Sequence, residues 1–143
     1  MACNLNLNFF EGLDIVNVSK KKPHPLVLEF CSGGLSIECP WRLIESGNIV
    51  IGQTDFLASS KKEYFNSLLV DSLRKRTVKR IDWLDDCYML RLYLTDNGIL
   101  DIFHDSTEQE GWELYHNDGF SLISLPGGEP ELSEKKGSTS DEA

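Results

Sequence analysis

Basic residues are scarce in this chain: 14 Lys and Arg stand against 23 Asp and Glu among 143 residues, which gives a formal net charge of −9. Proteins that bind nucleic acid depend largely on Lys and Arg placed against phosphates. The composition therefore disfavours direct binding of DNA or RNA. A surplus of carboxylates attracts basic proteins, although in many proteins such charge serves only solubility.

Long apolar runs are also lacking. No stretch approaches the roughly 20 apolar residues of a bilayer-spanning helix, and the first residues show no signal-peptide pattern. The four cysteines, Cys3, Cys31, Cys39 and Cys87, have no CxxC spacing. Cys31 and Cys39 flank one expected hairpin, where they can face each other, but buried apolar thiols are the simpler interpretation. We expect a cytoplasmic protein with reduced thiols and no membrane contact.

Histidine is rare, which limits the chemistry available, because a nucleophile needs a base within hydrogen-bond reach. Two constellations can be drawn: a thiol site of Cys39, His104 and Asp105, and a metal site of His104, Asp105 and His116. Neither has a spacing such as HExxH or paired CxxC that fixes its members on one surface. No glycine-rich loop opens a helix after a strand. We therefore expect no catalytic residue, no metal and no cofactor.

Short stretches with alternating apolar residues make up most of the chain, and this period of two is typical of half-buried strands. Turn residues separate them at 31–34, 45–48, 95–98 and 117–119. The expected strands lie at 13–18, 26–30, 35–39, 41–44, 49–51, 78–83, 90–94, 99–103, 112–114 and 120–123.

One amphipathic helix is expected at about 61–74. Ser60 and Glu63 have the spacing of a capping box, in which each side chain bonds the other residue's backbone N–H. An apolar stripe at helical spacing follows: Phe65, Leu68, Leu69 and Leu73.

The segments 13–52 and 78–124 follow a similar plan, so the sequence predicts an internal repeat. Trp41 and Trp112 occupy equivalent positions, and Arg42 follows the first of them. Core packing is the simpler role for two such tryptophans. The predicted fold class is α+β, mostly β: two similar antiparallel hairpin units, forming sheets or a partly open barrel, with the helix between them. Chance likeness of strand–turn–strand segments is the alternative.

A single β-rich domain is expected over 1–128. From 129 to 143 Glu, Ser, Lys, Gly and Asp dominate, which predicts a disordered acidic tail.

Acidic loops are the best candidates for contact with a partner. Asp85 and Asp86 lie between two expected strands, and Asp105, Glu108 and Glu110 lie in a polar connection longer than its neighbours. Longer loops on rigid sheets often carry binding, although solvated loops of this composition are common.

The motifs Ile37-Glu-Cys-Pro-Trp-Arg42 and Ser124-Leu-Pro-Gly-Gly128 resemble those of a family of small uncharacterised bacterial proteins that occur where acidic immunity proteins are found. That family has no agreed catalytic residues, so the resemblance transfers no site to this chain. Small size, acidic charge, cytoplasmic character and the lack of a convincing catalytic set favour a non-catalytic module that neutralises a basic bacterial toxin domain. A nuclease would suit best because its active site attracts carboxylates as well as phosphates. The alternatives are a housekeeping or structural interaction domain and, third, a domain that binds a small molecule between the units. The oligomeric state stays open.

Overall fold

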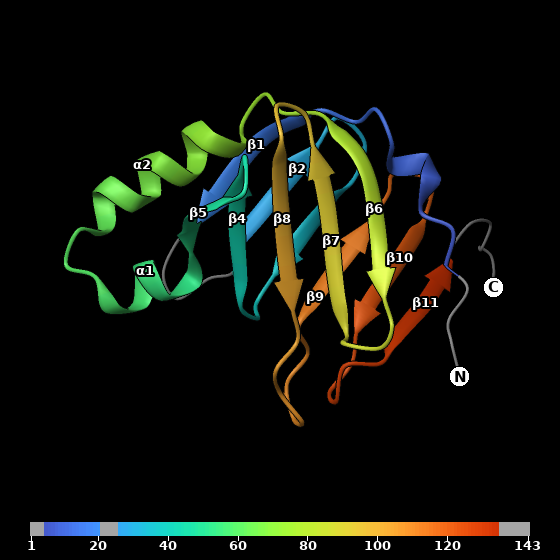
Figure 1. Cartoon of the computed structure of the whole chain (residues 1–143). Helices are drawn as coiled ribbons and strands as arrows, with labels where there is room; N and C mark the ends of the chain where they lie inside the picture. The colour runs from blue at the N-terminus through green and yellow to red at the C-terminus, as the bar shows by residue number, and fades with distance from the viewer. Residues whose placement is uncertain (1–4, 21–25, 135–143) are drawn as a thin grey trace.

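The computed structural model describes residues 5–20 and 26–134, which form two antiparallel sheets packed face to face (Figure 1). The six-stranded sheet has the order β1-β2-β3-β9-β10-β11, and the five-stranded sheet has the order β5-β4-β8-β7-β6. The predicted fold class is confirmed, and the structure has two sheets rather than a barrel. The strands are β1 Ile15–Lys20, β2 Leu26–Phe30, β3 Gly34–Ile37, β4 Trp41–Glu45, β5 Asn48–Gly52, β6 Val78–Leu84, β7 Met89–Leu94, β8 Gly98–Phe103, β9 Trp112–Tyr115, β10 Phe120–Ser124 and β11 Pro130–Glu134.

The two halves of the chain exchange hairpins between the sheets. β1–β3 lie in the six-stranded sheet while β4 and β5 cross to the other, and β6–β8 lie in the five-stranded sheet while β9 and β10 cross back. The joins are alike: Trp41 of β4 is directly opposite Ile102, and Trp112 of β9 is directly opposite Ile37. Each half therefore completes the sheet begun by the other.

The core lies between the sheets and is built from two rows of aliphatic side chains. Directly paired residues share one face of a sheet, so each row points inward as a unit. Every member has no exposed surface. One row is Leu28, Leu35, Leu114 and Leu122, and the other is Leu92, Leu100, Leu43 and Ile51.

Tight turns set the register of two hairpins in the five-stranded sheet. Ser46 and Gly47 between β4 and β5 have φ of 50° and 87°, and Asp96 and Asn97 between β7 and β8 have φ of 62° and 60°. The β4–β5 loop has two residues, and two positive φ values there match the right-handed twist of the strands. The β7–β8 loop has three residues, 95–97, because Leu94 pairs with Gly98. The turn residues predicted at 45–48 and 95–98 form these turns.

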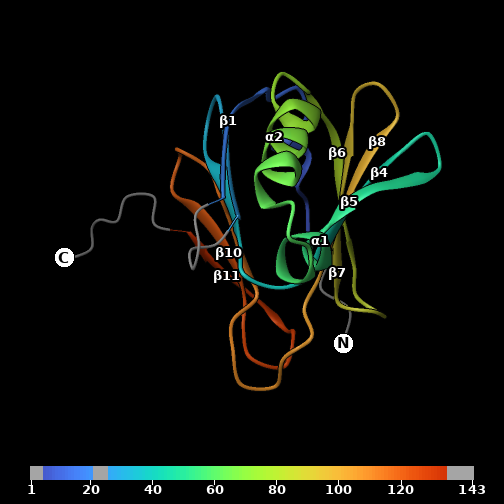
Figure 2. The same cartoon turned by 90° about the vertical axis from the view of Figure 1, so that its left-hand side faces the viewer.

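Two helices fill the gap between the sheets along one side, as Figure 2 shows. They are α1 Gln53–Ala58 and α2 Lys62–Leu73, and a short 3-10 turn, η1 Asn8–Phe10, precedes β1. Leu69 and Leu73 of α2 are fully buried. The helix predicted at 61–74 is present as α2, whereas α1 is too short to show a helical period in sequence.

Two local predictions are wrong. The predicted capping box does not form, because Lys61 stands at the N-cap without a side-chain bond and Ser59 Oγ instead accepts the Lys61 N–H at 2.9 Å. Residues 130–134 of the predicted disordered tail form β11, which pairs with β10 and gains backbone hydrogen bonds that composition does not reveal. Residues 135–143 lie outside the described residues. No helix within 5–20 and 26–134 is long and apolar enough to cross a membrane.

Candidate partner-binding surface

Four connections meet at one end of the sandwich, which we call the loop end: residues 38–40, 85–88, 104–111 and 125–129. Backbone hydrogen bonds join three of them, from Glu38 N to Gly111 O at 2.7 Å and from Gly127 N to Ser106 O at 2.9 Å. The fourth connection, 85–88, contacts the connection 125–129 through the ring of Tyr88. A Cβ built on Gly128 would lie 2.9 Å from that ring. Segments far apart in sequence thus form one surface (Figure 1).

The loop end carries carboxylates and no Lys or Arg. All five acidic residues predicted as a partner-binding set are there, and all are exposed: Asp85, Asp86, Asp105, Glu108 and Glu110. Sequence reasoning missed two further exposed members: Glu38 stands alone between Ile37 and Cys39, and Glu129 falls in the segment predicted as a disordered tail. The surface therefore bears seven carboxylates and no Lys or Arg, so the fields of the carboxylates add.

The longest of these connections has a fixed local shape. Ser106 Oγ accepts the backbone N–H of Glu108 at 3.1 Å and that of Gln109 at 2.9 Å. A serine that bonds the next backbone groups stabilises a turn without neighbouring strands. The carboxylates of 104–111 are therefore presented from an ordered turn, which lowers the entropy lost on binding.

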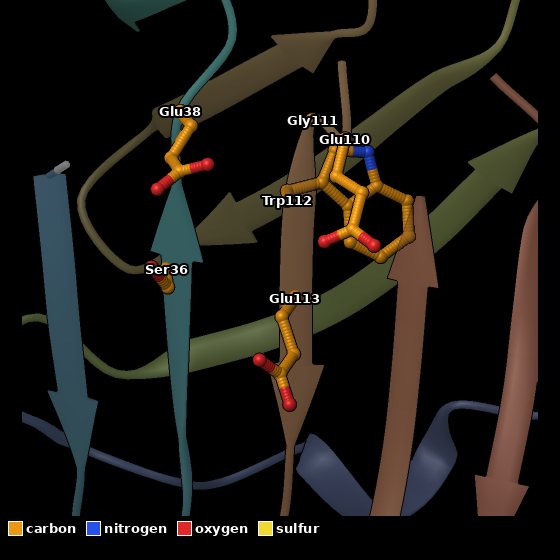
Figure 3. A pocket seen from close by; sticks show the side chains of 6 residues that line it. All are labelled: Ser36, Glu38, Glu110, Gly111, Trp112 and Glu113. Atoms are coloured by element: carbon orange, nitrogen blue, oxygen red, sulfur yellow. The ribbon is translucent and has the colours of Figure 1, made fainter. Parts of the chain in front are cut away.

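A small cavity of about 110 Å³ extends the acidic surface onto the outer face of the six-stranded sheet. Figure 3 shows Glu38, Glu110 and Glu113 around it, with Ser36 directly opposite Glu113 on the neighbouring strand. Glu113 Oε2 accepts the Ser121 hydroxyl at 3.0 Å, which fixes that carboxylate. The cavity is the size of a single cationic side-chain head rather than of a metabolite.

The thiol constellation that the sequence allows, Cys39 with His104 and Asp105, does not have the properties of a reactive site. Cys39 is only 4% exposed, and burial, followed by the charge of Asp105, raises the pKa of its thiol to about 12. A reactive cysteine needs the opposite, a lowered pKa and access to solvent. His104 does lie beside Cys39, near Gly111, but its Nδ1 is hydrogen-bonded to the hydroxyl of Ser124, which is fully buried. The arrangement serves packing rather than nucleophilic attack.

The proposed metal ligands are not brought together. His104 lies at the loop end, whereas His116 lies beyond the other end of β9, where its ring packs edge-on against Phe9 and Phe10. In the described part of the chain, no three His, Cys, Asp or Glu side chains are grouped so as to hold a metal ion.

Trp41 and Trp112 are both 2% exposed and form part of the core, as the simpler interpretation predicts. Trp41 packs against Phe56 of α1, and Trp112 packs against Trp83 of β6. Arg42 lies on the opposite face of β4 and points away from the core, where it pairs with Asp101.

Comparisons with protein-family models, with curated proteins and with solved structures found no match to this chain. What the chain binds is therefore inferred from the surfaces that its described residues form.

Proposed function

We propose that the chain is a non-catalytic protein-binding module of the immunity type, which neutralises a basic bacterial toxin domain through its loop end. The observation that supports this most directly is the meeting of four connections that together carry seven exposed carboxylates and no Lys or Arg. A surface of one charge sign speeds encounter with a partner of the other sign and excludes wrong partners.

The kind of partner follows from the same geometry. A basic catalytic cleft that has evolved to hold phosphates also attracts a carboxylate-rich surface. The ordered turn at Ser106 and the cavity between Glu38 and Glu113 give such a partner a shaped contact as well as a charged one. A nuclease toxin domain in the cytoplasm is the partner class that best matches these features.

The raised pKa of Cys39 and the separation of His104 from His116 give no support to the thiol and metal constellations that the sequence allows but does not favour. A binding role is therefore favoured over catalysis.

Affinity capture of the tagged protein from its native lysate, at low and at high salt, tests the proposal. We expect one basic protein at stoichiometric yield at low salt and a lower yield at high salt, because salt screens exposed charges. Absence of a partner at both salt concentrations would contradict the proposal and favour a housekeeping role.

A further inference from the structure

Four charged side chains lie in a row on the outer face of the five-stranded sheet: Arg42, Asp101, Arg91 and, directly opposite Arg91 on β6, Asp82. Arg42 of β4 and Arg91 of β7 are each directly opposite Asp101 of the intervening β8. Arg91 makes a two-point contact, Nε to Oδ1 at 2.6 Å and Nη2 to Oδ2 at 3.0 Å. Arg42 approaches from the other side, with Nε and Nη2 both 3.2 Å from Oδ2.

The Asp101 side chain has no exposed surface, although no described helix or strand covers this face of the sheet in either view (Figures 1 and 2). The two arginine side chains themselves shield it, and these side chains are 40% exposed at Arg42 and 26% exposed at Arg91. Asp101 therefore acts as an anchor that fixes both arginines. With Arg80 and Asp82 of β6, three arginines on this face stand against two aspartates, which leaves one positive charge. Arg42 Nη1 keeps no hydrogen-bond partner among the described residues.

The surroundings of this row are apolar and aromatic. The Arg42 guanidinium lies 5.7 Å from the centre of the Phe103 ring, and that of Arg80 on β6 lies 4.2 Å from the centre of the Tyr93 ring. No Lys or Glu occupies the outward paired positions of β4, β7 and β8, which we call the arginine face: Arg42, Ile44, Met89, Arg91, Tyr93, Ile99, Asp101 and Phe103. Arginine, aromatic residues and Met are enriched at the centres of protein interfaces, while Lys and Glu are depleted.

The opposite outer face of the sandwich differs in charge, since it carries Glu29, Glu113 and the acidic cavity. An acidic ligand is thus repelled by the loop end and by that face. Among the described residues of the five-stranded sheet it meets fixed guanidinium donors on the arginine face and at Arg80 of β6, where Asp82 lies beside the donor. A free phosphate would accept hydrogen bonds from the guanidinium groups but would leave the apolar side chains beside them exposed to water. A peptide with a ring or branched side chain between two carboxylates would also cover Phe103 and Ile99 and remove them from water.

We propose that the arginine face binds an acidic, partly apolar peptide segment of a protein partner. The guanidinium groups of Arg42 and Arg91 donate hydrogen bonds to the carboxylates of the segment, while Asp101 holds the two arginines in place. The arginine face shares no residue with the loop end, and it favours an acidic ligand where the loop end favours a basic partner. The segment lies in extended form across the strands, so that side chains on one side of it meet the row.

The probe is the peptide acetyl-Glu-Ser-Phe-Ser-Glu-amide, with a twin in which Gln replaces both Glu, and inorganic phosphate as a third ligand. Each is titrated into the whole ¹⁵N-labelled protein while the Nε–Hε signals of the arginines and the backbone amides are followed by NMR. We expect saturable shifts at Arg42, Arg91 and β8 with the acidic peptide, and at least about tenfold weaker binding of the twin, as the loss of charge-assisted bonds implies.

Arg42→Gln should weaken binding of the acidic peptide by at least about fivefold. Arg74 is an exposed arginine after α2, and Arg74→Gln should leave the affinity for the peptide unchanged. Arg42→Lys is the second variant if the glutamine variant does not fold, because an ammonium lacks the planar fork of donors. Reversing the charges at the loop end should not weaken binding of the peptide to the arginine face. Failure of this inference can therefore be told apart from failure of the proposed function, which depends on the loop end. Equal binding of the twin or of phosphate, shifts confined to other surfaces, or unchanged affinity in a folded Arg42 variant would overturn it.

Discussion

Gly128 lies against the ring of Tyr88, so closely that a Cβ at position 128 would stand 2.9 Å from a ring carbon. Gly128 belongs to the β10–β11 connection and Tyr88 to the β6–β7 connection, so the contact joins the two sheets at the loop end. Gly128 also has φ of 100°, a conformation that side chains rarely adopt. The acidic loops are therefore held in place by backbone and ring contacts rather than by charge.

Gly128→Ala should lower the free energy of unfolding by about 2–4 kcal/mol, the sum of left-handed strain and a clash with Tyr88. Gly127→Ala is a matched control, since Gly127 has φ of 92° but nothing within 4 Å of a built Cβ. Gly127→Ala should lower the free energy of unfolding only by the left-handed backbone strain, about 1–2 kcal/mol. Urea unfolding of both variants measures the difference, and equal costs would show that the contact with Tyr88 contributes nothing.

Cys39 should resist alkylation by iodoacetamide at pH 8, because burial raises its pKa to about 12 and the thiolate is the reactive form. Cys31, which is exposed, should react under the same conditions. Peptide mass spectrometry distinguishes the sites, and unfolding in urea should make Cys39 reactive. Rapid labelling of Cys39 in the folded protein would restore the thiol-site hypothesis.

The same shift makes stability depend on pH. The unfolded thiol loses its proton from pH 9.0 upward, while the folded thiol keeps its proton until about pH 12. The stabilisation is therefore complete below pH 9 and is lost as pH rises from 9 to 12. Between pH 8 and pH 10 wild-type protein should lose about 1 kcal/mol more than Cys39→Ala, measured by urea unfolding. Parallel losses would contradict the raised pKa.

Asp101→Asn should lower the free energy of unfolding by about 1–3 kcal/mol, because two partly exposed arginines lose a shared carboxylate with charge-assisted bonds. Asp96→Asn makes the same chemical change in the exposed β7–β8 turn, where Asn tolerates the φ of 62°. It should change stability by less than about 0.5 kcal/mol. Thermal or urea unfolding compares the two, and an Asp101 variant as stable as wild type would mean that the pairs do not stabilise the sheet.

Much of the fold could be predicted from sequence because alternating apolar residues and turn residues act locally. Leu26, Leu28 and Phe30, for example, identify β2 without knowledge of its neighbours. The sequence does not predict which strands pair when they are far apart along the chain. β11 is polar except for Leu132 and is a strand only because β10 is beside it.

The same reasoning explains the candidate surfaces. The five acidic loop residues were recognisable as runs of charge, whereas Glu38 and Glu129 join them only through the tertiary fold. In the sequence Arg42 stands out only because it follows Trp41. Its pairing with Asp101, 59 residues away, depends on the register of β4 and β8. No local pattern encodes that register.

The most direct test of the central claim compares the wild-type protein with a loop-end variant, Asp85→Lys, Glu108→Lys and Glu110→Lys, and with a control of equal charge, Glu29→Lys, Glu63→Lys and Asp71→Lys, whose positions are exposed elsewhere. The quantity measured is the amount of basic partner captured from native lysate at low salt. We predict at least about a tenfold loss for the loop-end variant and little loss for the control. Equal losses in both would show that net charge alone attracts the partner, and no loss in the loop-end variant would contradict a binding role for this surface.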